Sequence, residues 1–159
     1  MSEVVKCENL TKRYGGLTAL DQVSFTLESG RIIGLLGPNG SGKTTLIKLA
    51  NGLLVPSDGK IYLGGFEPGV ESKSIVSYLP DANYLPTWMN IQGLLEMFED
   101  FYNDFDIEKA KEMVGTLNLS MNSRLKTLSK GNKEKVQLIL AMSRKAKVYF
   151  LDEPIGGVD

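Results

Sequence analysis

The chain has 159 residues, with 18 Lys and Arg against 19 Asp and Glu, one Cys and no His. This length is enough for one domain with its own core, and the near-zero net charge gives no general attraction to nucleic acid, which we do not expect as a partner. With no His and a single Cys, disulfide frameworks and the usual nitrogen and sulfur metal sites are excluded, which leaves oxygen ligands alone.

The start of the chain and its hydropathy favour a cytoplasmic protein. Glu3 lies where a secretory signal would be basic and then apolar. No stretch approaches the roughly 18 uninterrupted apolar residues of a membrane span. A single cysteine also fits a reducing compartment.

The first half of the chain is predicted to contain mainly strands. Residues 4–10 and 23–27 have strand composition, and the second segment alternates as a half-buried strand does. Residues 32–36 are almost continuously apolar, which predicts a central strand covered on both faces. A short helix is expected over residues 44–50, directly after a glycine-rich loop.

The second half of the chain changes from strand to helix periodicity. After strands at 60–63 and 75–79, apolar residues recur at helical spacing from Ile91 to Tyr102 and again from Ile107 to Leu117. Asn90 is expected to cap the first of these helices, and Ser129 a third helix that runs to Arg144. A helical subdomain is therefore predicted at 91–128, followed by a buried strand at 148–151.

The glycine-rich loop has the pattern of a phosphate-binding loop. Residues 37–44 read glycine, four residues, glycine, lysine and threonine, between a predicted strand and a predicted helix. The glycines let backbone amides surround a phosphate, and the helix adds its positive N-terminal end. A glycine turn with a solvated lysine is the alternative. The predicted nucleotide-binding residues here are Gly37, Pro38, Asn39, Gly40, Ser41, Gly42, Lys43, Thr44 and Thr45.

Three of these side chains have distinct expected roles. Lys43 neutralises the β and γ phosphates, Thr44 offers its hydroxyl to Mg²⁺, and Thr45 bonds the α phosphate. Two acids, Asp152 and Glu153, follow the predicted strand at 148–151. Asp152 is expected to hold Mg²⁺ through a water, and Glu153 to orient or deprotonate the attacking water. The alternative is an ordinary solvated strand exit.

Together with Leu128 to Asn132, these motifs make the chain resemble the ATP-binding cassette (ABC) ATPases. The resemblance covers residues 3–159 and implies an α/β fold: a P-loop NTPase core sheet with an N-terminal antiparallel β part and a small α-helical subdomain. We expect one incomplete domain over 1–159, with its nucleotide-binding core at 1–90 and 129–159 and the helical subdomain at 91–128. The motifs in chain order are Tyr14, the phosphate loop, Tyr78 to Asp81, Leu128 to Asn132, Asp152-Glu153 and Gly157 to Asp159.

The family implies ATP and Mg²⁺ as ligands and further site residues. Tyr14 is expected to stack on adenine, with an ordinary aromatic at the sheet edge as the alternative, and Asp159 to belong to the nucleotide-contacting set. Asp81 stands where the family usually has a glutamine that bonds Mg²⁺ and the attacking water. Ser129 and the amide of Gly131 are expected to meet the γ phosphate held by a second cassette, although the two could be only a helix cap and a first-turn glycine.

The resemblance implies an ATP-hydrolysing subunit of a membrane transporter. Its expected partners are a second ABC ATPase subunit, identical or different, and separate transmembrane permease subunits that hold it at the inner face of the membrane. Trp88 and Met89 are candidates for the permease contact, and Lys130 in the signature resembles an exporter-type branch. The alternative is a soluble ABC ATPase that acts on ribosomes or DNA. Because the chain ends six residues after Glu153, we expect a shortened form that binds nucleotide but hydrolyses it poorly.

Overall fold

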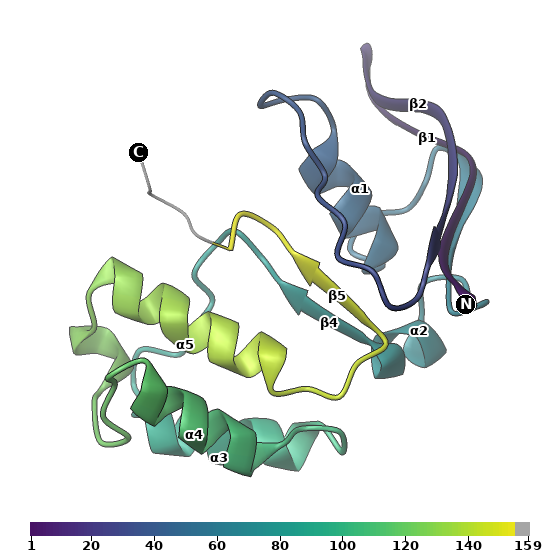
Figure 1. Cartoon of the computed structure of the whole chain (residues 1–159). Helices are drawn as coiled ribbons and strands as arrows, with labels where there is room; N and C mark the ends of the chain where they lie inside the picture. Colours follow the sequence, from purple (N-terminus) through teal and green to yellow (C-terminus); the bar gives the residue numbers. More distant parts are fainter. Residues whose placement is uncertain (155–159) are drawn as a thin grey trace. The chain divides into compact units, whose positions relative to one another are not determined.

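A computed structural model describes residues 1–154, which form two compact units, 1–76 and 77 onward. Figure 1 shows the helices and strands of the two units. The first unit is built on an antiparallel three-stranded sheet in the order β2-β1-β3. Its strands are β1 (Glu3–Tyr14), β2 (Leu17–Glu28) and β3 (Asp58–Leu63).

The alternation predicted for residues 23–27 is confirmed on β2, where Val23, Phe25 and Leu27 are half-buried and Ser24 and Thr26 are exposed. Cys7 lies opposite Phe25 on β2 and Ile61 on β3. Cys7 and Ile61 are both almost completely buried. Helix α1 (Lys43–Ala50) is confirmed where it was predicted, and it buries Ile47, Leu49 and Ala50. A short helix, α2 (Val70–Ile75), was not predicted.

The predicted central strand at 32–36 is absent from the structure. Residues 31–38 adopt no regular secondary structure, and Ile32 and Leu36 are almost fully exposed. An apolar run of this kind is buried only when strands flank it on both sides, because its backbone groups need partners as well as its side chains. Within residues 1–154 this segment joins neither sheet, so the prediction of a buried strand was wrong here.

The second unit contains a two-stranded sheet of β4 (Val76–Leu79) and β5 (Val148–Leu151). Figure 1 shows the two strands running in the same direction. β5 forms at the predicted residues, yet only Val148 is buried, and Leu151 is exposed. The reason is that β5 pairs with a strand on one side only in the described part of the chain.

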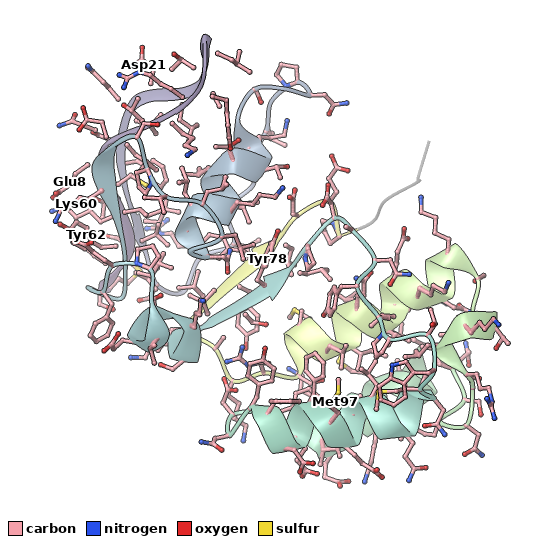
Figure 2. The ribbon with its side chains drawn as sticks, turned by 180° about the vertical axis from the view of Figure 1, so that it is seen from behind. Glu8, Asp21, Lys60, Tyr62, Tyr78 and Met97 are labelled. Atoms are coloured by element: carbon pink, nitrogen blue, oxygen red, sulfur yellow. The ribbon has the colours of Figure 1, made fainter. Side chains whose placement is uncertain are left out.

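Three helices form the apolar core of the second unit: α3 (Ile91–Phe101), α4 (Ile107–Thr116) and α5 (Lys130–Met142). Asn90 and Ser129 cap α3 and α5 as predicted, with side-chain oxygens that accept from the third amide of each helix. A short 3₁₀ helix, η1 (Leu125–Thr127), precedes α5. Their shared core contains Ile91, Leu94, Leu95, Ala110, Val114, Leu125, Val136, Ile139 and Leu140, with Met97 of α3 packed against it (Figure 2).

The C-terminal end of α5 is tied to several neighbouring elements. Arg144 is buried and forms a bidentate ion pair with Asp104, with nitrogen to oxygen distances of 2.8 and 3.1 Å. Its guanidinium also lies 4.1 Å from the ring centre of Tyr102. The last carbonyls of this region accept from the Ser77 hydroxyl, the Lys109 ammonium, the Asp106 amide and the Tyr149 hydroxyl. In residues 1–154 we find no helix with the length and apolar character needed to cross a membrane.

Candidate nucleotide site

The phosphate loop leads directly into α1 and requires glycine at specific positions. Gly40 and Gly42 have φ angles of 81° and 97°, in the left-handed region that side chains disfavour. A Cβ atom at Gly42 would lie 2.5 Å from the carbonyl oxygen of Ala19 and 2.9 Å from Leu20. The loop therefore packs closely against β2, and another residue at position 42 would force it away.

Lys43 lies within the loop itself. Its ammonium donates to the carbonyl oxygens of Gly37 and Pro38, the latter at 2.8 Å, and lies 3.3 Å from the hydroxyl of Ser41. These acceptors are neutral, and charged phosphate oxygens bind an ammonium more strongly. A phosphate that enters the loop can therefore replace these carbonyl oxygens as the acceptor of the Lys43 ammonium. Thr44 and Thr45 occupy the first turn of α1 and are half-buried.

Tyr14 belongs to the same unit as the phosphate loop. It ends β1, pairs with Leu17 of β2 and is 44% exposed, which leaves ring surface available to a ligand. The loop packs on Ala19 and Leu20 of the same strand β2. One strand pair therefore supports both the loop and the aromatic side chain.

Asp152 and Asp81 follow the ends of the paired strands β5 and β4. Asp152 is 5% exposed, and its amide donates to the carbonyl oxygen of Leu79 at 2.9 Å. Burial raises the pKa of Tyr78 on β4 (Figure 2), and the charges of Asp152 and Asp81 raise it further. Both carboxylates therefore act on the same hydroxyl, although Asp81 itself is exposed. Tyr78 belongs to the predicted motif Tyr78 to Asp81. Its apolar neighbours in the sequence gave no signal that its hydroxyl lies near two carboxylates.

The environment of Asp152 fits a divalent cation. Its Oδ2 atom is buried and has no hydrogen-bond partner among the described residues. A buried carboxylate oxygen without a partner is costly unless a cation or a donor satisfies it. The predicted donors Thr44, Asp81 and Asp152 offer only hydroxyl and carboxylate oxygens, which Mg²⁺ prefers.

Glu153 has an unusual backbone conformation. Its φ angle is 49°, in the left-handed region, and its side chain is exposed. Non-glycine residues in this region are uncommon and cluster at functional sites. The turn places adjacent acids in different environments, since Asp152 is buried and Glu153 reaches solvent.

The predicted signature lies on the surface at the start of α5. Ser129, Lys130 and Gly131 are exposed, and the Ser129 hydroxyl oxygen accepts from the Asn132 amide at 3.2 Å. An anion that approaches the helix from outside would therefore meet no covering side chain at Gly131. Asp159 lies outside the described residues. Of the candidate permease contacts, Trp88 is 77% exposed, whereas Met89 packs against the helical core.

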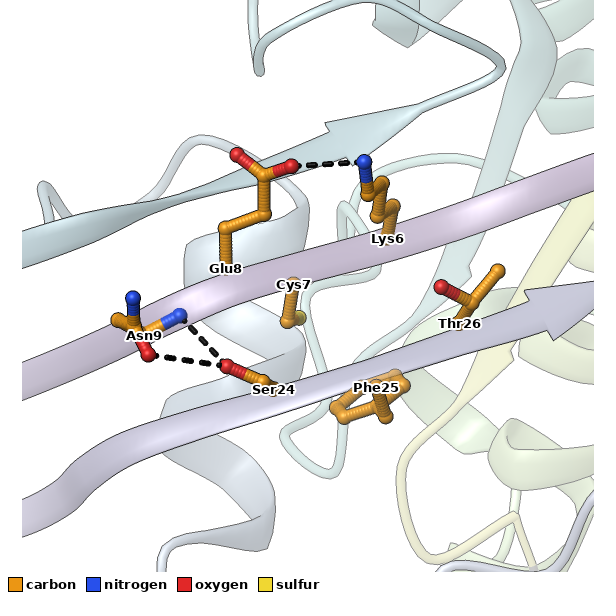
Figure 3. A pocket seen from close by; sticks show the side chains of 7 residues that line it. All are labelled: Lys6, Cys7, Glu8, Asn9, Ser24, Phe25 and Thr26. Carbon is orange, nitrogen blue, oxygen red and sulfur yellow. Dashed lines mark hydrogen bonds and ion pairs between the residues drawn. The ribbon is translucent and has the colours of Figure 1, made fainter.

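A hollow over β1 and β2 is lined by Lys6, Cys7, Glu8, Asn9, Ser24, Phe25 and Thr26 (Figure 3). Its charged and polar groups are already paired: Lys6 with Glu8 at 2.7 Å and Asn9 with Ser24. Burial raises the pKa of the Cys7 thiol to about 12, so the thiol stays protonated near neutral pH. These residues offer neither a nucleophile nor an unpaired charge.

Comparison with known sequences identifies relatives of the whole chain. The family profile for ABC transporters matches residues 20–156. YdbJ of Bacillus subtilis (strain 168), an uncharacterised ABC transporter ATP-binding protein, is 33% identical over 98% of this chain and 52% of its own length. MJ1023 of Methanocaldococcus jannaschii, likewise uncharacterised, is 34% identical over 100% of this chain and 59% of its own length. LptB of Haemophilus influenzae, a lipopolysaccharide export system ATP-binding protein, is 32% identical over 98% of this chain and 69% of its own length. The chain spans a little more than half the length of the first two relatives.

Solved structures agree with these sequence matches. The ATP-binding subunit of an ABC transporter superposes with a TM-score of 0.87 at 26% identity, over 98% of this chain and 68% of that one. A putative ABC transporter ATP-binding protein from Pyrococcus furiosus superposes with a TM-score of 0.85 at 26% identity, over 99% of this chain and 78% of that one. The predicted fold class is thereby confirmed. The profile match over most of the chain and these similarities show that it belongs to the family of ABC transporter ATP-binding proteins.

Proposed function

We propose that the chain is the ATP-binding and ATP-hydrolysing part of a membrane transporter. The single observation that carries this proposal is the glycine loop around the Lys43 ammonium at the start of α1. In this proposal Lys43 neutralises the β and γ phosphates and Thr45 bonds the α phosphate, while loop amides surround the remaining oxygens. Tyr14 stacks on the adenine.

The carboxylates and Thr44 serve the metal and the water. Thr44, Asp81 and Asp152 are the proposed oxygen ligands, Asp152 through a water; the unpartnered Oδ2 of Asp152 supports this assignment. Bound Mg²⁺ would neutralise charge that develops on the phosphates. Glu153, which is exposed and follows Asp152 directly in the chain, orients or deprotonates the attacking water, since the chain has no histidine to do so.

The partners in this proposal are protein subunits. A second ABC ATPase subunit, identical to this chain or different from it, binds its own ATP, and the exposed Ser129 and Gly131 of this chain contact the γ phosphate of that ATP. Asp159 contributes to the same nucleotide contact. Permease subunits contact the exposed Trp88 region and hold the protein at the inner face of the membrane. Export is the proposed direction, supported by Lys130 in the signature and by the export role in the printed name of LptB.

Binding and hydrolysis are expected to separate in this 159-residue chain. Residues 32–36, which lead into the phosphate loop, are exposed and form no strand in the described part of the chain, so the loop is held on the β2 side and not by the segment that precedes it. Positioning errors reduce transition-state stabilisation far more than they reduce binding. We therefore propose that the chain, as one nucleotide-binding domain with residues 91–128 as its helical part, binds ATP but turns it over slowly.

Two measurements test the proposed function. Because the loop binds phosphates, affinity should fall in the order ATP, ADP, AMP in equilibrium titrations; equal affinities would contradict a phosphate site. Isolation of the chain from a detergent extract of its own cells should then recover a polytopic membrane protein. Recovery of ribosomal RNA or DNA in its place would favour the soluble alternative and contradict the transporter role.

A further inference from the structure

Lys12 lies on β1, two residues before Tyr14. Its ammonium lies 5.2 Å from the centre of the Tyr14 ring. A cation within about 6 Å over an aromatic face is attracted by the negative charge of that face. The contact therefore favours one orientation of a ring that is otherwise 44% exposed.

The Lys12 ammonium also has a second partner, which fixes it in place. It donates to the carbonyl oxygen of Val55 at 2.8 Å. Val55 belongs to the segment that follows α1, the helix on which Lys43 begins. Ser57 of the same segment bonds β1 as well, through its amide to Thr11 at 2.8 Å and through its hydroxyl oxygen from the Arg13 amide at 2.9 Å. Lys12 thus links the Tyr14 ring to the segment that leaves the phosphate-binding helix.

We propose that Lys12 is a positioning residue for the nucleotide base: it holds one face of the Tyr14 ring so that the other face receives adenine. This inference rests on the proposed function, in which Tyr14 stacks on the base. Ordering an exposed side chain during binding lowers affinity, and a ring that is already held avoids that loss. Because Lys12 contacts the ring and a backbone carbonyl, its effect belongs to ligands that carry a base.

The test compares MgATP with magnesium tripolyphosphate, which has the phosphates but no base. Lys12→Met keeps most of the aliphatic stem and removes the cation, and Lys12→Arg keeps a cation able to reach both partners. Lys60→Met is the matched control, since Lys60 pairs with Glu67 on the surface of β3, away from Tyr14. We expect Lys12→Met to weaken MgATP about two- to fivefold, the range that corresponds to an exposed cation–π contact.

The remaining arms separate the possible outcomes. Tripolyphosphate affinity should stay unchanged in Lys12→Met, which also shows that the variant is folded, and Lys12→Arg and Lys60→Met should match the wild type for both ligands. Unchanged MgATP affinity in Lys12→Met would overturn the proposal, and so would an equal loss for tripolyphosphate, which would mean that Lys12 acts on phosphate. A wild-type chain that binds neither ligand would instead contradict the proposed function itself.

Discussion

Asp152 donates its backbone amide to the carbonyl oxygen of Leu79 at 2.9 Å, two residues before Asp81. This bond joins the residue that follows β5 to the last residue of β4. It holds the buried Asp152 beside the end of the neighbouring strand. Its Oδ2 atom has no hydrogen-bond partner in the described part of the chain. A cation at this position would satisfy an oxygen that residues 1–154 leave without a partner.

Asp152→Asn should therefore separate stability from metal dependence. We expect the Mg²⁺-dependent part of ATP affinity to fall by about tenfold or more, as for other groups that hold a metal through water. In the absence of Mg²⁺ the variant should be at least as stable as the wild type, because a neutral amide replaces a buried carboxylate whose Oδ2 has no partner among the described residues. Titrations with and without Mg²⁺, together with denaturant unfolding, measure both effects. An Mg²⁺ dependence that survives the substitution would remove Asp152 from the metal site.

Glu153→Gln should affect hydrolysis and leave binding intact. The amide keeps the shape of the side chain but cannot accept a proton, so we expect single-turnover hydrolysis to slow by about a hundredfold or more at unchanged ATP affinity. An ATP-bound dimer should accumulate, visible by size-exclusion chromatography. Near-normal turnover in this variant would show that another group positions the water.

Cys7 should make stability depend on alkaline pH. Because burial raises its pKa to about 12 in the folded protein, the unfolded chain loses the thiol proton first, near its ordinary pKa of roughly 8.5 to 9. The contribution of the neutral thiol is therefore complete below that range and is lost as pH rises from there toward 12. Urea midpoints at pH 7 and pH 10.5 measure the loss, and Cys7→Ala should show a smaller decline between the two. An identical decline in both proteins would contradict this assignment.

The Arg144 and Asp104 pair should stabilise the second unit more than a surface pair stabilises the first. Arg144 is 8% exposed, so Asp104→Asn weakens a charged hydrogen bond where water replaces it poorly, with an expected cost of about 2 kcal/mol. Glu67→Gln is the matched control, because its ion pair with Lys60 is exposed on both sides and is screened by water, so its loss should change the unfolding midpoint little. Denaturant unfolding of both variants decides whether burial makes the difference.

Local signals in the sequence predicted much of the fold. Asn90 and Ser129 were expected as caps and both accept from helix amides, because a capping side chain acts within a few residues of its own position. α2 was missed because its six residues are too few to show helical periodicity. The strand expected at 32–36 failed for a different reason: its burial depends on strands far away in the sequence, which no local pattern reports.

In the site too, features formed by neighbouring residues were predicted, and features formed by distant segments were not. The loop pattern alone indicated Lys43 and its surrounding glycines, since the motif is contiguous. The close approach of Gly42 to Ala19 and the carboxylate charges around Tyr78 arise from segments separated in the chain, so nothing in the sequence predicted them. The contact of Lys12 with Tyr14 was not predicted either; its one signal in the sequence is their spacing of two on a strand.

ATP binding through Lys43 is the central claim, and Lys43→Ala tests it most directly. The Lys43 ammonium donates to loop carbonyls in a solvent-exposed position. Removing this side chain should therefore change the unfolding midpoint little and leave the fold intact. MgATP affinity, measured by equilibrium titration of the 159-residue chain, should fall by about a hundredfold or more, since the lysine contacts two charged phosphates. Equal MgATP affinity in the wild type and in a folded Lys43→Ala variant would contradict the account.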